Sequence, residues 1–329
     1  MVTLPHPAGT SPASRAGTSL GHALAVVFDA PETLRIAQLD LAEPGAEDVV
    51  VEIEWSGIST GTERLLWTGR MPAFPGMGYP LVPGYESVGR VVHAGAAAQR
   101  CVGEQVFVPG ARWSGPVRGL FGGAASRLVV PGARTVPIAA ALGESAVLLA
   151  LAATAQHAVA GGATPDLIVG HGVLGRLLAR LAALHGGEPV VWERNPGRRS
   201  GASGYQVLDP AADARRDYRA IYDVSGDSGL LDELIARLAP GGEIVLAGFY
   251  GEPLSFQFAP AFMREARLRV AAEWREPDLA AVRELIASGR LGLDGLITHR
   301  AVATDADSAY RVAFGEPDCL KMVLDWRSC

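Results

Sequence analysis

The chain has 329 residues, of which 49% are apolar and 19% are charged, so its composition is that of a folded globular protein with room for two domains. The net charge of −6, without a basic stripe, argues against a nucleic-acid partner, and the absence of an apolar run of about eighteen residues argues against an integral membrane segment. The three cysteines, at positions 101, 319 and 329, have no paired spacing, so they suit a reducing cytoplasm and predict neither a disulfide framework nor a zinc cluster.

The N-terminal part of the chain predicts a β-rich domain. Residues 1–21 are rich in Pro, Ser, Thr, Gly and Ala and have no apolar core, so we expect a flexible tail and not a secretory signal. Short apolar or alternating runs, separated by Gly and Pro, predict strands at 23–28, 48–55, 88–92, 105–108 and 126–130. The segment 70–80 is too rich in proline for either regular structure.

Near residue 139 the pattern changes to alternating helices and strands. An Ala- and Leu-rich helix is expected over 139–159, and buried strands are expected at 165–169, 189–192, 207–208, 220–224, 244–248 and 268–272. Further helices are expected at 176–184, 230–238 and 279–286, and a short terminal strand at 321–324. This alternation predicts a parallel, doubly wound sheet, so the fold class is α/β.

The strand at 165–169 leads directly into the turn Gly170-His171-Gly172-Val173-Leu174-Gly175. A glycine turn of this spacing between a strand and a helix, followed by a second strand, is the dinucleotide-binding fingerprint. The first glycine permits the turn, the second lets the backbone approach a pyrophosphate, and the third lets the helix pack close to the strand. We expect all six turn residues to border the cofactor, with His171 solvated; the alternative is a turn that binds no ligand.

Glu193 ends the second strand, eighteen residues after Gly175. A carboxylate at this place accepts hydrogen bonds from the adenosine ribose hydroxyls and repels a 2′-phosphate, so NAD is favoured over NADP. Arg194 leaves the choice open, because a guanidinium could bind that phosphate or cover the adenine. We expect Ser225 to border the adenosine, and Gly248-Phe249 to approach the nicotinamide ribose.

A β-rich domain, a nucleotide-binding domain and a short return segment resemble the medium-chain dehydrogenase/reductase family. The motifs that carry the resemblance are 56–63 (SGISTGTE), 82–89 (VPGYESVG), the glycine turn and 295–300 (GLITHR). The resemblance implies a GroES-like β-rich catalytic domain formed by 22–138 and 273–329, a Rossmann domain over 139–272, and an active site in the cleft between them. It also implies that Lys321 is a cationic contact of the pyrophosphate.

The zinc-dependent members of that family hold their metal with residues that this chain lacks. The first cysteine position corresponds here to Ser59, the histidine position to Tyr85 and the second cysteine position to a residue near Ala150, and only Glu86 remains. One carboxylate cannot replace three or four zinc ligands, so we predict no catalytic zinc.

Without a metal, the hydroxyl proton of an alcohol needs another acceptor. Tyr85 and Ser59 stand where the metal would be and could hydrogen-bond a substrate oxygen, whereas His157 could act as a base or relay. Glu86 and Glu63 could accept hydrogen bonds behind them. The alternatives are structural. Ser59 could cap a helix and Tyr85 could close the barrel. His157 could belong to the core and Glu86 could pair with an arginine.

The segments 57–63, 70–86 and 119–124 resemble one branch of the family more closely, the NAD-linked, zinc-free dehydrogenases of bacteriochlorophyll synthesis. Members of that branch oxidise the 3-hydroxyethyl side chain of a bacteriochlorophyllide to 3-acetyl, which implies a tetrapyrrole substrate. A flat apolar ring needs an apolar cleft. Six aromatic and Met residues could line it, or could only pack the domain seam: Met71, Phe74, Met77, Tyr79, Trp113 and Phe121.

Two other functions remain open. A zinc-free quinone or enone reductase that uses NADPH would share every cofactor motif. A nucleotide-binding protein without catalysis would explain the lost zinc ligands. The edge of such a nucleotide-binding sheet often pairs between copies, so a homodimer is also expected.

Overall fold

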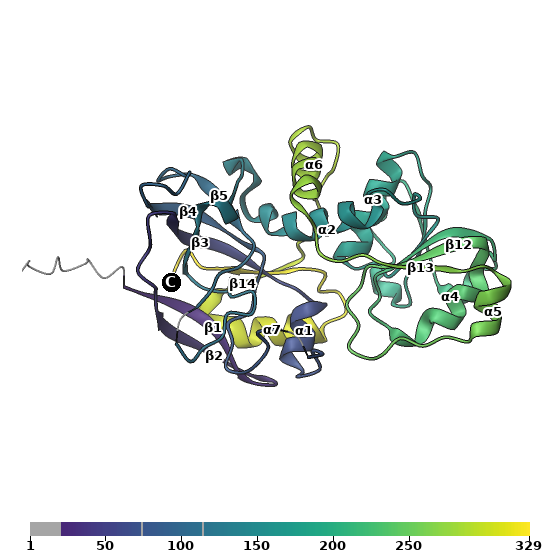
Figure 1. Ribbon diagram of the computed structural model, residues 1–329, viewed down its shortest axis with the longest axis horizontal. Coiled ribbons are helices and arrows are strands. Elements are labelled where there is room, and N and C mark those ends of the chain that lie inside the picture. The colour runs from purple at the N-terminus through teal and green to yellow at the C-terminus, as the bar shows by residue number, and fades with distance from the viewer. Residues whose placement is uncertain (1–20, 74, 114) are drawn as a thin grey trace, which may run out of the picture.

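The computed structural model describes residues 21–73, 75–113 and 115–329, and it has two lobes side by side (Figure 1). The tail expected at 1–21 therefore lies outside the described residues, apart from Gly21. The C-terminal segment, yellow in Figure 1, runs back among the purple N-terminal strands of the first lobe. The GroES-like and Rossmann architecture expected from the sequence is confirmed.

The first lobe is built on a seven-stranded sheet with the order β14-β15-β3-β4-β5-β7, in which β6 also pairs with β3. A separate hairpin, β1 (His22–Ala30) and β2 (Thr33–Asp40), lies beside it. The sheet strands are β3 (Asp48–Ile58), β4 (Ser87–Ala94), β5 (Gln105–Val108), β6 (Arg127–Pro131), β7 (Val136–Pro137), β14 (His299–Val302) and β15 (Met322–Asp325). Its helices are α1 (Thr62–Trp67) and α7 (Ala306–Gly315).

The second lobe is a six-stranded parallel sheet with the order β10-β9-β8-β11-β12-β13. Its strands are β8 (Leu167–Val169), β9 (Val190–Trp192), β10 (Gln206–Leu208), β11 (Tyr218–Asp223), β12 (Leu238–Leu246) and β13 (Arg267–Val270). Its helices are α3 (Val173–Leu184), α4 (Leu231–Arg237) and α5 (Phe258–Met263), whereas α6 (Glu276–Ala287) lies between the two lobes (Figure 1). The strand order reverses between β8 and β11, and in such sheets nucleotides bind outside the carboxyl ends of the strands at this point.

The helix expected over 139–159 is divided into two pieces. A 3₁₀ segment, Ala140–Leu148, precedes α2 (Leu149–Val159), and Gly143 breaks the first piece with a φ of 51°. The stretch Ala140–Val159 is long and apolar enough to cross a membrane by length and composition alone. Its side chains nevertheless pack in a core with both lobes, which is the environment of a core helix.

That core joins the lobes. It contains Val88 and Phe107 of the first sheet, Val323 of β15, much of α2 and α3, and Leu279 and Val282 of α6. Figure 1 shows α2 and α6 between the lobes. The border at 138/139 therefore stays a prediction, because packing is continuous across it.

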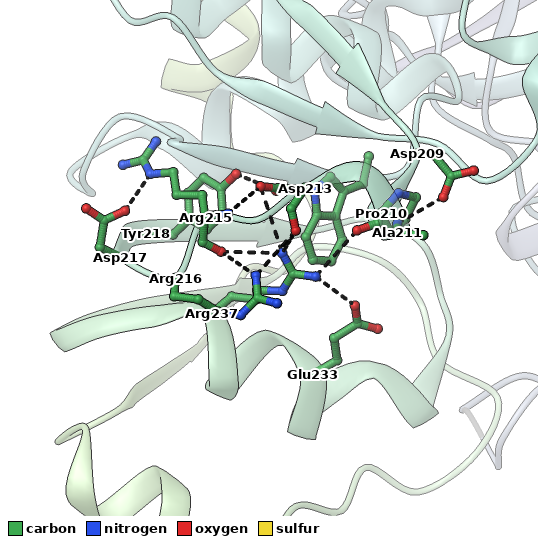
Figure 2. Close-up of polar contacts among 11 residues, drawn as sticks. Asp209, Pro210, Ala211, Asp213, Arg215, Arg216, Asp217, Tyr218, Glu233 and Arg237 are labelled. Atoms are coloured by element: carbon green, nitrogen blue, oxygen red, sulfur yellow. Dashed lines mark hydrogen bonds and ion pairs between the residues drawn. The ribbon is translucent and has the colours of Figure 1, made fainter.

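A buried polar network holds the segment that connects β10 to β11 (Figure 2). Asp213 Oδ2 accepts hydrogen bonds from Tyr218 OH at 2.6 Å and from Trp192 Nε1 at 2.7 Å. The Arg237 guanidinium lies 3.8 Å from Asp213 Oδ1 and 3.6 Å from Glu233. Burial raises the pKa of Asp213, but these hydrogen bonds and the cation together hold it below its usual value.

Candidate active site

The site begins with two hydroxyl groups at the ends of neighbouring strands. Ser59 follows β3 and Tyr85 precedes β4, and these strands pair antiparallel with Ser56 opposite Ser87. The pairing brings Ser59 Oγ and Tyr85 OH to 2.5 Å, across 26 residues of sequence. Ser59 is buried and Tyr85 is half-buried. These two predicted site residues therefore do lie together.

The Tyr85 phenol keeps its proton in this environment. Burial raises its pKa, and the carboxylates of Glu86 and Glu63 raise it further, more than the Ser59 hydrogen bond lowers it. A neutral phenol can donate a hydrogen bond to a substrate oxygen or pass a proton on, but it is not a tyrosinate base. The role of Tyr85 as a proton acceptor stays a prediction.

Behind the hydroxyl pair lies a buried ion pair. Lys321 Nζ is 2.6 Å from Glu86 Oε2 and 3.1 Å from the Ile58 carbonyl oxygen, and both charged side chains are at most 1% exposed. Burial raises the pKa of Glu86 and the Lys321 ammonium lowers it, with the net shift upward. Glu86 Oε1 is buried and has no partner among the described residues.

Lys321 is the only lysine in the chain. The family resemblance implies a contact with the cofactor pyrophosphate, but the structure places the ammonium on Glu86. Glu86 therefore forms a structural ion pair, as one alternative expected, but its partner is Lys321 and not an arginine.

A second buried carboxyl group belongs to Glu63 on α1. Glu63 Oε1 accepts the Ser59 backbone N–H at 3.2 Å, and Oε2 accepts the Tyr310 hydroxyl at 2.9 Å. Burial, followed by the charge of Glu86, raises the pKa of Glu63 to about 8. Sequence reasoning named Glu63 only as a possible acceptor and missed Tyr310, which lies 247 residues away and has no local signal.

His157 is not brought to the hydroxyl pair. Its Nδ1 lies 2.9 Å from Asp278 Oδ2, and the same oxygen accepts the Arg275 N–H at the start of α6. Within 21–73, 75–113 and 115–329, no hydrogen bond or ion pair joins His157 to Ser59 or Tyr85. The histidine therefore ties α2 to α6, which agrees with the structural alternative.

The glycine turn has the conformation that its spacing predicts. Gly170 has a φ of 106°, and α3 begins at Val173. A Cβ on Gly175 would lie 1.9 Å from the Gly170 carbonyl oxygen, so only glycine fits there. A Cβ on Gly172 would meet nothing within 4 Å, which leaves room for a phosphate above the helix N-terminus.

The expectation that His171 is solvated is wrong. Its side chain is buried: Nδ1 lies 2.6 Å from the Arg198 carbonyl oxygen and Nε2 lies 2.9 Å from Tyr205 OH. Burial lowers its pKa to about 4, so the imidazole is neutral. The segment after β9 folds back over the turn, and this long-range contact was not visible in the sequence.

The other cofactor candidates stand at the carboxyl ends of the parallel strands. Glu193 Oε2 accepts the His171 backbone N–H at 3.2 Å, which places the carboxylate beside the turn. Arg194 is exposed, 3.5 Å from Asp227. Ser225 follows β11, and Gly248 and Phe249 follow β12.

Of the described residues predicted to contact a large apolar substrate, one borders the hydroxyl pair. Phe121 lies beside the hydroxyl pair: its ring centroid is 5.0 Å from that of Tyr85, and its φ of 70° is unusual for a residue with a side chain. Phe121 and the other described ones are all buried in or packed against the core of the first lobe: Met71, Met77, Tyr79, Trp113 and Phe121. Phe74 lies outside the described residues.

The side chains present do not suit a metal. No group of three or more His, Cys, Asp or Glu that could hold an ion occurs in the part of the chain that the structure describes. The three family ligand positions carry a serine and a tyrosine hydrogen-bonded to each other, and a buried alanine at 150. No chemical step is therefore assigned to a metal.

Comparisons with known proteins agree with this geometry. Residues 45–140 match the model of the alcohol dehydrogenase GroES-like domain. The chain is 59% identical to the 2-desacetyl-2-hydroxyethyl bacteriochlorophyllide A dehydrogenase of Rhodobacter capsulatus, over 92% of this chain and 98% of the relative. It is also 59% identical to the enzyme of the same name from Cereibacter sphaeroides, with the same coverage.

Solved structures share the fold at lower identity. An alcohol dehydrogenase from Escherichia coli CFT073 in complex with NADH superposes with a TM-score of 0.78 at 21% identity, over 93% of this chain and 99% of that one. A dehydrogenase from Sinorhizobium meliloti 1021 bound to NADP gives the same TM-score, identity and coverage. Nicotinamide dinucleotides of both kinds thus occur on this fold.

Proposed function

The chain belongs to the medium-chain dehydrogenase/reductase family, and on that premise we propose that it oxidises the 3-hydroxyethyl group of a bacteriochlorophyllide to 3-acetyl with NAD⁺. The enzyme is an oxidoreductase of the alcohol dehydrogenase type. The observation that carries the substrate assignment is the 59% identity to two bacteriochlorophyllide dehydrogenases over 92% of this chain. The contact between the Ser59 and Tyr85 hydroxyl groups supports the chemistry.

The cofactor proposal depends on the glycine turn and Glu193. The pyrophosphate would lie on the free N–H groups at the start of α3, where Gly172 leaves room. The Glu193 carboxylate, adjacent to the turn, would accept the ribose hydroxyls and repel a 2′-phosphate, which favours NAD⁺ over NADP⁺.

The substrate hydroxyl would bind to the pair formed by Ser59 and Tyr85. The hydroxyl proton would leave through this hydroxyl pair, and NAD⁺, when bound, would accept the hydride of the carbinol carbon, so the products would be the ketone, NADH and one proton. The phenol that Ser59 contacts is neutral, so it acts by hydrogen bonding and not as a fixed anion. The ring of Phe121, edge-on to Tyr85, would contact the macrocycle.

The test is a pigment turnover assay. Purified protein with NAD⁺ and 3-hydroxyethyl bacteriochlorophyllide should shift the pigment absorption band and form one NADH per acetyl product. An unmoved band together with NADPH-dependent quinone reduction would instead establish the quinone reductase alternative. Binding of NADH without either activity would indicate a protein that has kept the fold and lost catalysis.

The reaction should also be independent of zinc. Residues at the three family ligand positions offer hydroxyl and methyl groups, and these do not form a zinc site. Metal analysis should find less than about one-tenth of a zinc per chain, and a chelator should leave turnover unchanged. Stoichiometric zinc, or inactivation by the chelator, would refute the zinc-free mechanism.

The surface of the second lobe supports a homodimer. Strand β13 is the last of the sheet, and Val270 on it is 76% exposed. Phe258, Phe262 and Met263 of the neighbouring α5 are 65–77% exposed. Apolar side chains beside an open strand edge are typical of a self-complementary interface.

Light scattering measures the mass directly. Wild type should be a dimer and Val270→Lys a monomer, whereas Val102→Lys, which changes a valine that is 65% exposed on the first lobe, should remain a dimer. A monomeric wild type at micromolar concentration would refute the interface.

We also propose a cytoplasmic location, since the free thiols Cys101 and Cys329 are exposed and suit a reducing compartment.

A further inference from the structure

The Glu63 carboxyl group connects the Ser59 backbone to helix α7. It lies on α1 with no exposed surface, and each of its oxygens has a separate partner. One partner is the backbone N–H of Ser59, at 3.2 Å; the other is the Tyr310 hydroxyl, at 2.9 Å. The Ser59 carbonyl oxygen in turn accepts the Glu63 N–H at 3.1 Å, so two hydrogen bonds join the ends of the segment 59–63.

Tyr310 is itself fixed by aromatic packing. Its ring is edge-on to Phe28, with centroids 5.2 Å apart, and stacks on Trp67 at 6.3 Å. Phe314, one helical turn further along α7, closes the cluster at 5.6 Å. The phenol therefore presents its hydroxyl to Glu63 from a rigid position, and Glu63 transmits that position to Ser59.

We propose that Glu63 is a positioning residue: held by Tyr310, it fixes the backbone of Ser59 so that the serine hydroxyl stays against Tyr85 and toward the substrate alcohol. The inference rests on the proposed dehydrogenase function and adds to it the group that orders the hydroxyl pair. The 2.5 Å contact between Ser59 Oγ and Tyr85 OH is the geometry that this arrangement maintains.

The charged groups around Glu63 give the proposal a pH signature. Glu86 raises the pKa of Glu63, whereas Tyr310, the Ser59 N–H and Lys321 lower it, and burial brings the result to about 8. The phenol of Tyr85 is the other titratable group that faces it. At pH 7 the carboxyl group is mostly protonated. Above pH 8 it is an anion, whose hydrogen bond to the Ser59 N–H is stronger.

Three variants separate positioning from simple stability. Glu63→Gln resembles the protonated acid, so at pH 7 kcat/KM should stay within about tenfold of wild type, without the rise near pH 8 that is expected of wild type. Glu63→Ala frees the loop and should lower kcat/KM about 100-fold, as misplacement of a reacting group by about an ångström does. Tyr310→Phe removes a hydrogen bond that lowers the Glu63 pKa, so the midpoint should move to higher pH.

Tyr218→Phe is the matched control, because that phenol also donates to a buried carboxylate, at 2.6 Å, in the second lobe. It should lower the melting temperature and leave the pH midpoint unchanged. The assays use pigment turnover with NAD⁺, and NADH fluorescence confirms that each variant binds cofactor.

The outcomes are distinct. No pigment turnover by wild type refutes the proposed function. If wild type turns over the pigment, the proposed function stands and the positioning role is tested by itself. That role is refuted if Glu63→Ala is as active as Glu63→Gln, or if the midpoint of the pH profile is the same in Tyr310→Phe as in wild type. If Glu63→Ala does not fold, Glu63→Gln and Tyr310→Phe decide through their pH profiles.

Discussion

Removal of the Lys321 ammonium should destabilise the protein strongly. Lys321→Met leaves the Glu86 carboxyl group buried, with one oxygen that has no partner among residues 21–73, 75–113 and 115–329 and the other deprived of its 2.6 Å contact. Breaking a buried ion pair from one side costs about 3–5 kcal/mol. Because the entropy of unfolding is about 2.1 cal/mol/K per residue, or about 0.7 kcal/mol/K for the whole chain, the melting temperature should fall by about 4–7 °C.

The loss should depend on pH. Burial raises the pKa of Glu86 in the folded protein, and Lys321→Met removes the cation that lowers it, so the pKa of Glu86 rises further in the folded variant. An unfolded chain ionises the same group in the ordinary carboxyl range. The stability penalty is therefore small at acidic pH and grows as the pH rises through the folded pKa.

Thermal unfolding followed by circular dichroism at pH 5 and pH 8 measures both effects. Glu86→Gln/Lys321→Met should recover at least half of the loss at pH 8, because no unpaired charge remains. Lys321→Arg keeps the charge but places a larger, planar head group in a fully buried space, so it should not match wild type. A melting temperature of Lys321→Met within 1 °C of wild type at both pH values would refute this account of the ion pair.

Four further outcomes are expected. Tyr85→Phe should lower kcat about 100-fold or more, and turnover unchanged within a few-fold would remove its hydroxyl from the reaction. Glu193→Ala should raise the ratio of kcat/KM for NADP⁺ over NAD⁺ about tenfold, and an unchanged ratio would leave Arg194 as the determinant. Gly175→Ala places a Cβ 1.9 Å from a backbone oxygen of the turn, so NADH fluorescence should show no binding. Asp213 has a lowered pKa, so its stabilising effect is present at neutral pH and lost as the pH falls through that value; Asp213→Asn should therefore lose less stability than wild type between pH 5 and pH 3.

The nucleotide-binding half was largely determined by local sequence. A buried strand, a turn that only glycine allows, and a helix follow one another within about twenty residues, so their chemistry needs no distant partner. The turn at 170–175 and Glu193 were predicted in this way, and the structure places the Glu193 carboxylate beside the turn, before the start of α3. Strand β2 was missed although its alternating pattern was a usable signal.

The arrangement of the candidate site residues was decided by the tertiary structure. Lys321 meets Glu86 across 235 residues and Tyr310 meets Glu63 across 247, because β15 returns to pair with β3 and α7 packs beneath α1. The burial of His171 depends on a segment that folds back from beyond β9. Short-range sequence patterns indicate which face of a strand or helix is apolar. They do not indicate which distant polar groups will be in contact, because those contacts form only in the tertiary structure. A polar group that is buried there without a hydrogen-bond partner destabilises the fold. By itself the sequence therefore predicted the fold, which is confirmed, and the cofactor-binding role of the glycine turn and the absence of a zinc site, which stay predictions; the structure alone showed which side chains meet around Ser59 and Tyr85.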